Sequence, residues 1–362
     1  MKAKGLGLGA GSWGLLLLGI VAPMGGTAAQ RLDWHSVATL YADNTEFFTP
    51  YRVGETIMGG QLSTWLAARY SHGSELRVGV FADHRSGSEH FTDSLKPIIA
   101  FRHEGPHSLG VIGTLETVDR HGLLEPIMVT TRELTTPIEY GGQWIERRRK
   151  FFGEAWLNWQ KLNTPDQREQ FEMGTVLRAM PIRHVDIALQ HLWYHRGGQL
   201  YHPTPVTNNH VVAVGATLHD SLGKLGRASL SAWGLWSSGH ITPYYPGDRP
   251  DRGHGVYVRA AVTPWNWAEV FAIHWVGRNF SGDAGDNNYS STGSEQSFYQ
   301  SRRVYTEIGM IRKTPVGGGV TFDAEWRFHN IDNLKSISFF NSRWEISYRL
   351  VVRAPIDIIV RR

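Results

Sequence analysis

The chain has 362 residues, of which 41% are hydrophobic and 19% charged, and both fractions are below those of an average soluble domain. Its 40 glycines and 12% aromatic residues favour many short strands and turns over a disordered chain or a coiled coil. The absence of cysteine excludes disulfides, thiolate metal sites and cysteine nucleophiles. The formal net charge of +4 is small for this length and does not indicate a nucleic-acid partner.

The N-terminal segment 1–29 is typical of a secretion signal peptide. Lys2 and Lys4 give it a positive start, and an apolar run over 15–22 follows them. Small residues then precede the expected cleavage site near Ala29. The run is shorter than the roughly 20 residues that a membrane-spanning helix needs. We therefore expect export of the remaining chain, either as a soluble protein or as a membrane β-barrel.

From residue 30 onward, polar and apolar side chains alternate, which is typical of strands with one wet and one apolar face. The clearest example is the segment 320–329. There, Phe322 and Trp326 lie on the apolar face, while Glu325 and Arg327 lie on the polar face. In a membrane barrel the first face contacts lipid and the second faces inward.

Short and long connections alternate along the chain. The turn near 148–150 is short, whereas the connections near 118–136 and 279–301 are long. Short turns on one side and long loops on the other are typical of outer-membrane barrels. The segments number about 16, with about 14 or about 18 as alternatives. We predict an all-β fold, an antiparallel transmembrane β-barrel over 30–353, with a short C-terminal tail over 354–362.

The signal peptide, the cysteine-free remainder, the alternating strands and the uneven loops together resemble Gram-negative outer-membrane β-barrel proteins of the porin kind. The resemblance covers the whole chain after the signal peptide and concerns architecture, since no family-specific motif is present. It implies a location in the outer membrane and insertion by the barrel-insertion machinery. One departure is the C-terminus, which ends in Arg361 and Arg362 where such barrels usually end in an aromatic residue.

Charged residues of both signs occupy alternate strand positions. An Arg or Lys facing lipid at the bilayer midplane costs about 2–4 kcal/mol, so these residues are expected to line the barrel interior. They serve either to orient a solute in a pore or to form a salt-bridge lattice that fills the barrel. Barrels of about 16 strands leave a channel, which favours the pore. The predicted lumen-lining residues are Arg69, Arg77, Arg102, Glu139, Arg147, Glu154, Arg259, Arg303, Glu307, Asp323, Glu325, Arg327, Arg343, Glu345 and Arg349.

One glycine-rich connection carries a possible metal site. Asp283, Asp286 and Asn287 supply hard oxygen ligands of the kind that Ca²⁺ prefers. The spacing is not that of an EF-hand, and a solvated outer loop accounts for the same composition.

Catalytic motifs are weak in this sequence. His103–His107 matches the letters of the zinc-protease motif H-E-x-x-H, but Gly105 and Pro106 place it in a turn between strands. No G-x-S-x-G motif is present. We therefore predict no enzyme and no cofactor beyond the calcium ion.

The function predicted from these observations is an outer-membrane channel for passive diffusion of small polar solutes. The alternatives are an exporter of a secreted polysaccharide and an outer-membrane hydrolase. The expected partners are outer-membrane lipid, a small polar solute and the insertion machinery, with no nucleic acid.

Overall fold

The computed structural model describes residues 29–70, 73–203, 205–223, 226–241, 250–293, 298–332 and 343–361. The predicted signal peptide, apart from Ala29, lies outside these ranges. Within the described ranges, no helix is long and apolar enough to cross a membrane.

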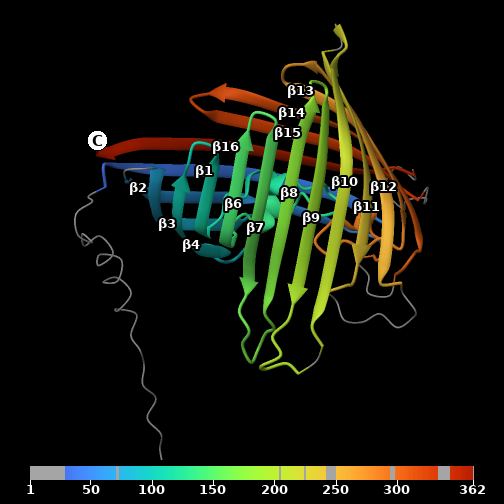
Figure 1. The fold of residues 1–362 in the computed structure, drawn as a ribbon, viewed down its shortest axis with the longest axis horizontal. Helices are drawn as coiled ribbons and strands as arrows, with labels where there is room; N and C mark the ends of the chain where they lie inside the picture. The colour runs from blue at the N-terminus through green and yellow to red at the C-terminus, as the bar shows by residue number, and fades with distance from the viewer. Residues whose placement is uncertain are drawn as a thin grey trace, which may run out of the picture.

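Sixteen antiparallel strands form one closed barrel, in which consecutive strands pair and β1 pairs with β16 (Figure 1). This confirms the predicted fold class and strand number. The strands are β1 (Arg31–Phe48), β2 (Val53–Arg69), β3 (Ser74–Arg85), β4 (Ser94–Glu104), β5 (Ser108–Thr114), β6 (Tyr140–Arg148), β7 (Phe151–Lys161), β8 (Gln170–Ile182), β9 (Val185–Arg196), β10 (Thr207–Ser221), β11 (Arg227–Ser238), β12 (Arg252–Trp265), β13 (Ala268–Arg278), β14 (Arg302–Gly317), β15 (Val320–Ile331) and β16 (Glu345–Arg361).

The two ends of the barrel differ in their connections. Short turns, such as that between Arg148 and Phe151, lie at the end where β1 begins and β16 finishes. Longer connections lie at the opposite end, and the segment 115–139 between β5 and β6 is one of them. In outer-membrane barrels the long loops are extracellular, so we name this the outer end and the other the periplasmic end.

The last strand is longer than the sequence predicts. β16 continues to Arg361 and pairs with β1 as far as Leu32, so residues 354–361 extend the strand where a tail was expected. Two adjacent isoleucines and a proline break the alternation there. The edge of β1 nevertheless provides pairing partners, and His35 Nδ1 lies 2.6 Å from Asp357 Oδ1. Pairing between the two ends of the chain therefore outweighs the irregular local pattern.

The strands alternate between lipid and interior as the sequence indicates. On β15, Trp326 and Phe328 are 39% and 47% exposed on the outside of the wall. The side chains that alternate with these two face the interior. There, Arg327 contacts Glu125 and Glu325, and His329 contacts Ser347. This arrangement places apolar side chains against the membrane and polar side chains inside.

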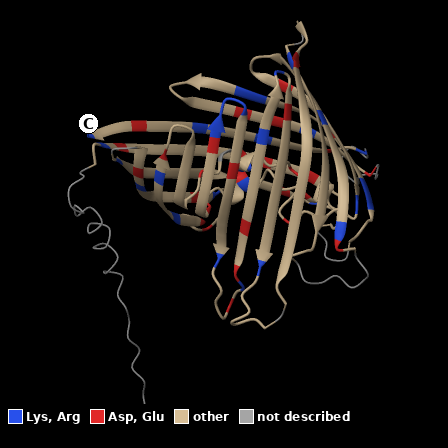
Figure 2. Ribbon diagram, viewed as in Figure 1, with Lys and Arg blue, Asp and Glu red and all other residues tan. Residues whose placement is uncertain are grey.

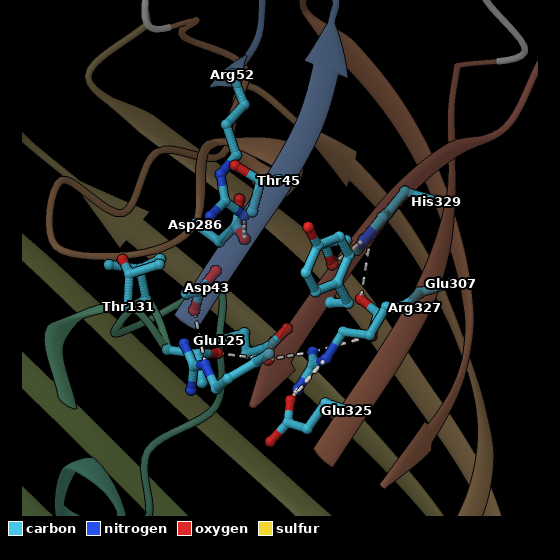
Figure 3. Close-up of a pocket in the computed structure, with 15 residues that line it drawn as sticks. Asp43, Thr45, Arg52, Glu125, Thr131, Asp286, Glu307, Glu325, Arg327 and His329 are labelled. Carbon is cyan, nitrogen blue, oxygen red and sulfur yellow. Dashed lines mark hydrogen bonds and ion pairs between the residues drawn. The ribbon is translucent and has the colours of Figure 1, made fainter. Parts of the chain in front are cut away.

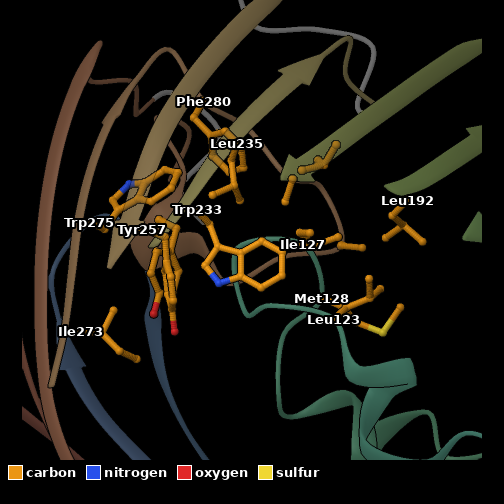
Figure 4. Packing of buried hydrophobic residues seen from close by; sticks show 14 of the residues in the cluster. Leu123, Ile127, Met128, Leu192, Trp233, Leu235, Tyr257, Ile273, Trp275 and Phe280 are labelled. Atoms are coloured by element: carbon orange, nitrogen blue, oxygen red, sulfur yellow. The ribbon is translucent and has the colours of Figure 1, made fainter. Parts of the chain in front are cut away.

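Two long connections fold into the barrel and form what we call the plug, consisting of residues 115–139 and 279–293. Apolar plug residues, including Leu123, Ile127 and Met128, belong to one buried cluster with wall residues such as Trp233 and Leu192 (Figure 4). Val129 N donates to Ala284 O at 2.9 Å, which joins the two parts of the plug.

Polar contacts tie the plug to opposite walls. Arg132 makes a bidentate ion pair with Glu172 of β8, with distances of 2.6 and 2.8 Å. Gln61 of β2 donates to the carbonyl oxygen of Leu134 at 2.7 Å. The plug therefore spans the interior between β2 and β8, and the bore is not left open across its full width. Strand number alone does not set the width of a channel when the loops fold inward.

Candidate active site

The most reactive arrangement of side chains lies on the inner face of β14, β15 and β16, near the outer end of the barrel (Figure 3). The register pairs Glu307 with His329, and His329 with Glu345. Ser347 follows two residues after Glu345, on the same face of β16. Antiparallel pairing thus brings Glu307, His329 and Ser347 together from three neighbouring strands, and Tyr305, two residues before Glu307 on β14, lies beside them.

These side chains form a continuous hydrogen-bonded chain. His329 Nε2 lies 2.8 Å from Ser347 Oγ. His329 Nδ1 lies 2.6 Å from Tyr305 Oη, which in turn donates to Glu307 Oε2 at 2.6 Å. Glu307 Oε2 is also 3.8 Å from His329 Nδ1. A hydroxyl, an imidazole and an acidic anchor in this order are the elements of nucleophilic catalysis by serine.

The hydrogen bonds assign the proton positions. Tyr305 Oη donates its proton to Glu307 Oε2, so the Tyr305 oxygen accepts from His329 Nδ1. His329 is then protonated on Nδ1, and its Nε2 carries a free lone pair directed at Ser347. A serine hydroxyl can donate its proton only to an imidazole in this state. The chain therefore prepares His329 to act as a general base.

Arg327 anchors this group to the plug. Its guanidinium lies 2.9 Å from Glu307 Oε1, 2.9 Å from Glu325 Oε2 and 2.6 Å from Glu125 Oε1. Burial alone would raise the pKa of the Glu125 carboxyl, but the charges of Arg327 and Arg120 outweigh it and hold that pKa well below its usual range. Because Glu125 belongs to the plug, a shift of the plug would change the charge balance around Glu307.

Ser347 and His329 line a small cavity of about 30 Å³, together with Arg52, Arg327 and Arg349. This volume is enough for a water molecule but not for an acyl chain. Arg349 is paired with Asp43 at 2.6 Å, and Arg52 is paired with Asp286 of the plug. Guanidinium groups beside a serine and a histidine are suited to stabilise an oxyanion that forms at the serine.

A second buried histidine lies in the plug and has a different environment. His121 Nδ1 is 2.5 Å from Glu154 Oε1, and His121 Nε2 is 3.2 Å from Glu139 Oε2. Its ring stacks on Trp156 with centroids 3.9 Å apart. Burial alone would lower the pKa of His121, but hydrogen bonds to the two carboxylates, together with their charge, raise it to about 9. His121 therefore carries a proton on both nitrogens and cannot act as a base.

The predicted lumen-lining residues lie mostly in ion pairs within the protein rather than along an open channel. Charged residues are distributed over many strands of the barrel (Figure 2). Arg77 and Arg102 each pair with Glu75 and Glu116, and Arg303 pairs with Asp332. The other pairs are Arg69 with Asp33 and Glu75, Arg259 with Glu269, Asp323 with Arg353, Glu139 and Glu154 with His121, Glu307 and Glu325 with Arg327, and Arg349 with Asp43 and Glu133.

Three of the predicted lumen residues do not belong to these pairs. Glu345 accepts a hydrogen bond from the backbone N–H of Phe48 at 3.3 Å. Arg147 is exposed at the periplasmic end of β6 and lines a cavity there. Arg343 is exposed and lies before β16 rather than within it, because that strand begins only at Glu345.

The residues of the predicted calcium site lie in the second part of the plug rather than in an exposed loop. Asp286 is paired with Arg52 and accepts from the backbone N–H of Asn288 at 2.8 Å. Asp283 Oδ1 accepts from the Ser281 hydroxyl at 3.2 Å. Asn287 begins the short helix η4 (Asn287–Tyr289). Across the described residues, no group of three or more His, Asp or Glu side chains is arranged to hold a metal ion.

The sequence analysis missed Ser347, His329 and Tyr305 as site residues. The signal was present, because His329 and Ser347 lie on the polar faces of their strands together with predicted lumen charges. The sequence does not give the register between β14, β15 and β16, and it is this register that brings the polar side chains together. Serine and histidine are also frequent in this chain, so a serine and a histidine that are close in sequence do not by themselves indicate a catalytic pair.

Comparison with known proteins gives a family and a fold. The model of a family described as lipid A 3'-O-deacylase-type matches residues 25–358. No curated protein matches the chain. Among solved structures, OmpT of Vibrio cholerae lacking loop L8 is 8% identical with a TM-score of 0.55, and covers 91% of this chain and 100% of its own. OccK8 (OprE) of Pseudomonas aeruginosa is 10% identical with a TM-score of 0.53, and covers 92% and 100%.

OprD of Pseudomonas aeruginosa is likewise 10% identical with a TM-score of 0.51, and covers 92% of this chain and 97% of its own. At such low identity these likenesses concern the fold alone, and they confirm the architectural resemblance to outer-membrane barrels of the porin kind. The match to a deacylase family contradicts two predictions, a passive channel and the absence of enzymatic activity. Both predictions were wrong, and the alternative of an outer-membrane hydrolase agrees with the match.

Proposed function

We propose, from the premise that the chain belongs to the lipid A 3'-O-deacylase-type family, that it hydrolyses the ester joining an acyl chain to the 3' oxygen of lipid A. Ser347 is the nucleophile, His329 is the general base, and Tyr305 and Glu307 are positioning residues. The observation that carries this proposal is the hydrogen-bonded chain from Ser347 through His329 and Tyr305 to Glu307.

The first half of the reaction forms an acyl-enzyme. Ser347 Oγ attacks the ester carbonyl carbon while its proton passes to His329 Nε2, at the 2.8 Å separation seen here. The bond between the carbonyl carbon and the sugar oxygen then breaks. His329 returns the proton to that oxygen, so the deacylated sugar leaves as an alcohol.

The second half restores the enzyme. Water attacks the acyl-serine carbonyl, again losing a proton to His329 Nε2, and Ser347 recovers that proton when the fatty acid leaves. Tyr305 and Glu307 keep Nδ1 protonated, which stabilises the imidazolium that forms in each half. The guanidinium groups of Arg52, Arg327 and Arg349 line the same cavity and supply positive charge to the oxyanion.

The depth of the site in the barrel supports a substrate of the outer leaflet. His329 and Ser347 lie within the first few residues of their strands from the outer end. The site cavity of about 30 Å³ is too small for an acyl chain, so the substrate must displace the plug residues Val129, Thr130 and Thr131 that line it. Signal peptide cleavage near Ala29 and insertion by the barrel machinery are further parts of this proposal.

The test is hydrolysis of lipid A in vesicles by the reconstituted protein. We expect wild type to release 3' fatty acid and Ser347→Ala to lose about 10³-fold or more in kcat. Ser63→Ala is the matched control, because Ser63, on β2, lines a larger neighbouring cavity of the interior and does not line the cavity of Ser347 and His329. A folded Ser347→Ala protein with wild-type activity would exclude this serine as the nucleophile. A wild-type protein without activity on lipid A would overturn the function itself.

A further inference from the structure

The wall of the barrel has a notch at its outer half, between β4 and β7. β4 pairs with β3 along Ser94–His103 but with β5 only from Ala100 onward, so its edge over 94–99 has no strand partner there. β5 ends at Thr114, and β6 begins at Tyr140. The pairing of β7 with β6 stops at Asn158, although β7 continues to Lys161. Because β5 and β6 are short, the barrel wall extends less far toward the outer end here than it does at β4 and β7.

Local sequence features explain why the wall stops here. Gly113 has a φ of +108°, and a Cβ at this position would lie 2.1 Å from the carbonyl oxygen of Ile99. The pairing of β5 with β4 ends at this glycine, whereas its pairing with β6 continues to Thr114. Pro97 lies on the free edge of β4, where a residue without an N–H is tolerated. Tyr140 Oη donates to the Pro97 carbonyl at 2.8 Å and so satisfies an acceptor that a strand would otherwise take.

A pocket of about 740 Å³ lies behind the notch, which is within the range of about 300–1,000 Å³ typical of ligand sites. Lys96 of β4 and Lys161 of β7 line it from the two sides of the notch. Neither lysine has an ion-pair partner among the described residues, in contrast to most interior charges of this barrel. Outside the notch, Leu95, Ile99 and Trp159 are 67%, 52% and 39% exposed and face the membrane.

We propose that this notch is a lateral entrance through which an acyl lipid with phosphate groups passes from the outer leaflet into the pocket, where Lys96 and Lys161 bind its phosphates. The inference rests on the proposed function, since lipid A is the substrate assumed. An opening with apolar side chains on its membrane side and two unpaired ammonium groups inside is suited to a lipid that carries both acyl chains and negative charge. A water-soluble solute would need no opening toward the membrane.

The plug separates this pocket from the catalytic cavity. Val129 lines both of them, and Arg132 lines the pocket next to it. A lipid in the notch therefore lies one plug segment away from Ser347. Displacement of Val129 would join the two spaces, which accounts for the small size of the cavity in the structure described here.

Binding can be measured without catalysis by using the Ser347→Ala protein. Lipid A and its dephosphorylated form are titrated into the purified barrel in detergent. For the Lys96→Gln/Lys161→Gln variant we expect a Kd for lipid A about tenfold higher, and an unchanged Kd for the dephosphorylated lipid. An unchanged Kd for both lipids would overturn phosphate recognition by these lysines.

Blocking the notch tests the entrance itself. The chain has no cysteine, so a single one at Gln160, which lines the pocket, can be labelled with a bulky maleimide. We expect labelled Gln160→Cys to lose lipid A binding, and labelled Val214→Cys, on the outer face of β10, to retain it. Equal binding by the two labelled proteins would exclude the notch. Loss of binding in Gln160→Cys together with an inactive wild type would support the lipid site and reject the hydrolysis.

Discussion

His121 and His329 are both buried inside the barrel, yet their partners give them opposite roles. His121 lies between two carboxylates, Glu154 and Glu139, and donates from both ring nitrogens. His329 has one hydroxyl on each side, and only the hydroxyl of Tyr305 is tied to a carboxylate. The first histidine is held as a cation, and the second retains a lone pair for the Ser347 proton.

The comparison shows that burial alone does not make a histidine reactive. Two acceptors fix both protons, and the resulting ion cluster holds the plug to the wall at β7 through Glu154. An acceptor on one side and a donor on the other fix a single tautomer, which is the requirement for a general base. The identity of the second partner therefore separates a structural histidine from a catalytic one.

The largest expected effect comes from exchanging each histidine for glutamine. His329→Gln removes the base, and we expect kcat for lipid A to fall by about 10³ to 10⁶. His121→Gln leaves the chain at Ser347 intact, so its kcat should change by less than about tenfold at 25 °C. Rates of fatty acid release from vesicles distinguish the two. Equal losses in both variants would mean that plug integrity, and not base catalysis, limits the reaction.

A smaller loss is expected from Glu307→Gln. The amide no longer fixes the Tyr305 proton, so the tautomer of His329 is no longer set and Nε2 is protonated in part of the molecules. We expect kcat to fall by about 10² to 10⁴ with little change in KM. Asp323→Asn is the control, because Asp323 pairs with the half-exposed Arg353 away from the site. A wild-type kcat for Glu307→Gln would remove Glu307 from the mechanism.

The fold could be predicted from the sequence, and the site could not. Alternation such as that of Phe322, Glu325 and Trp326 reflects a local requirement of each strand, to place one face in lipid and one in the interior. The plug depends on contacts between distant segments, such as Val129 with Ala284. The sequence does contain one indication of the plug. Residues 123–129 are mostly apolar although they lie in a long connection, and a solvated loop would not contain such a run. The chain from Ser347 to Glu307 further depends on register across three strands.

The stability of the plug should depend on pH through His121. Its pKa rises from 6.5 to about 9 on folding, which corresponds to about 3 kcal/mol of stabilisation. Because the folded pKa is the higher one, this contribution is complete below pH 6.5 and is lost as the pH rises through about 9. Hydrogen exchange of the segment 115–139 should accelerate over this range beyond the intrinsic pH effect. His121→Gln should show no such additional acceleration.

The smallest effect, and the sharpest test of the comparison, is expected from Glu139→Gln. Glu139 makes the longer of the two contacts, 3.2 Å against 2.5 Å for Glu154, and an amide oxygen can still accept from His121 Nε2. Only the charge is lost, so the pKa of His121 should fall by about one pH unit, and the plug should lose about 1.4 kcal/mol of stability. The midpoint of the exchange transition would then move down by a similar amount. Glu154→Gln should shift it by a similar amount, because both carboxylates raise the pKa of His121. If neither variant moves the midpoint, the two carboxylates do not hold His121 as a cation, and the distinction between the two histidines must come from burial instead.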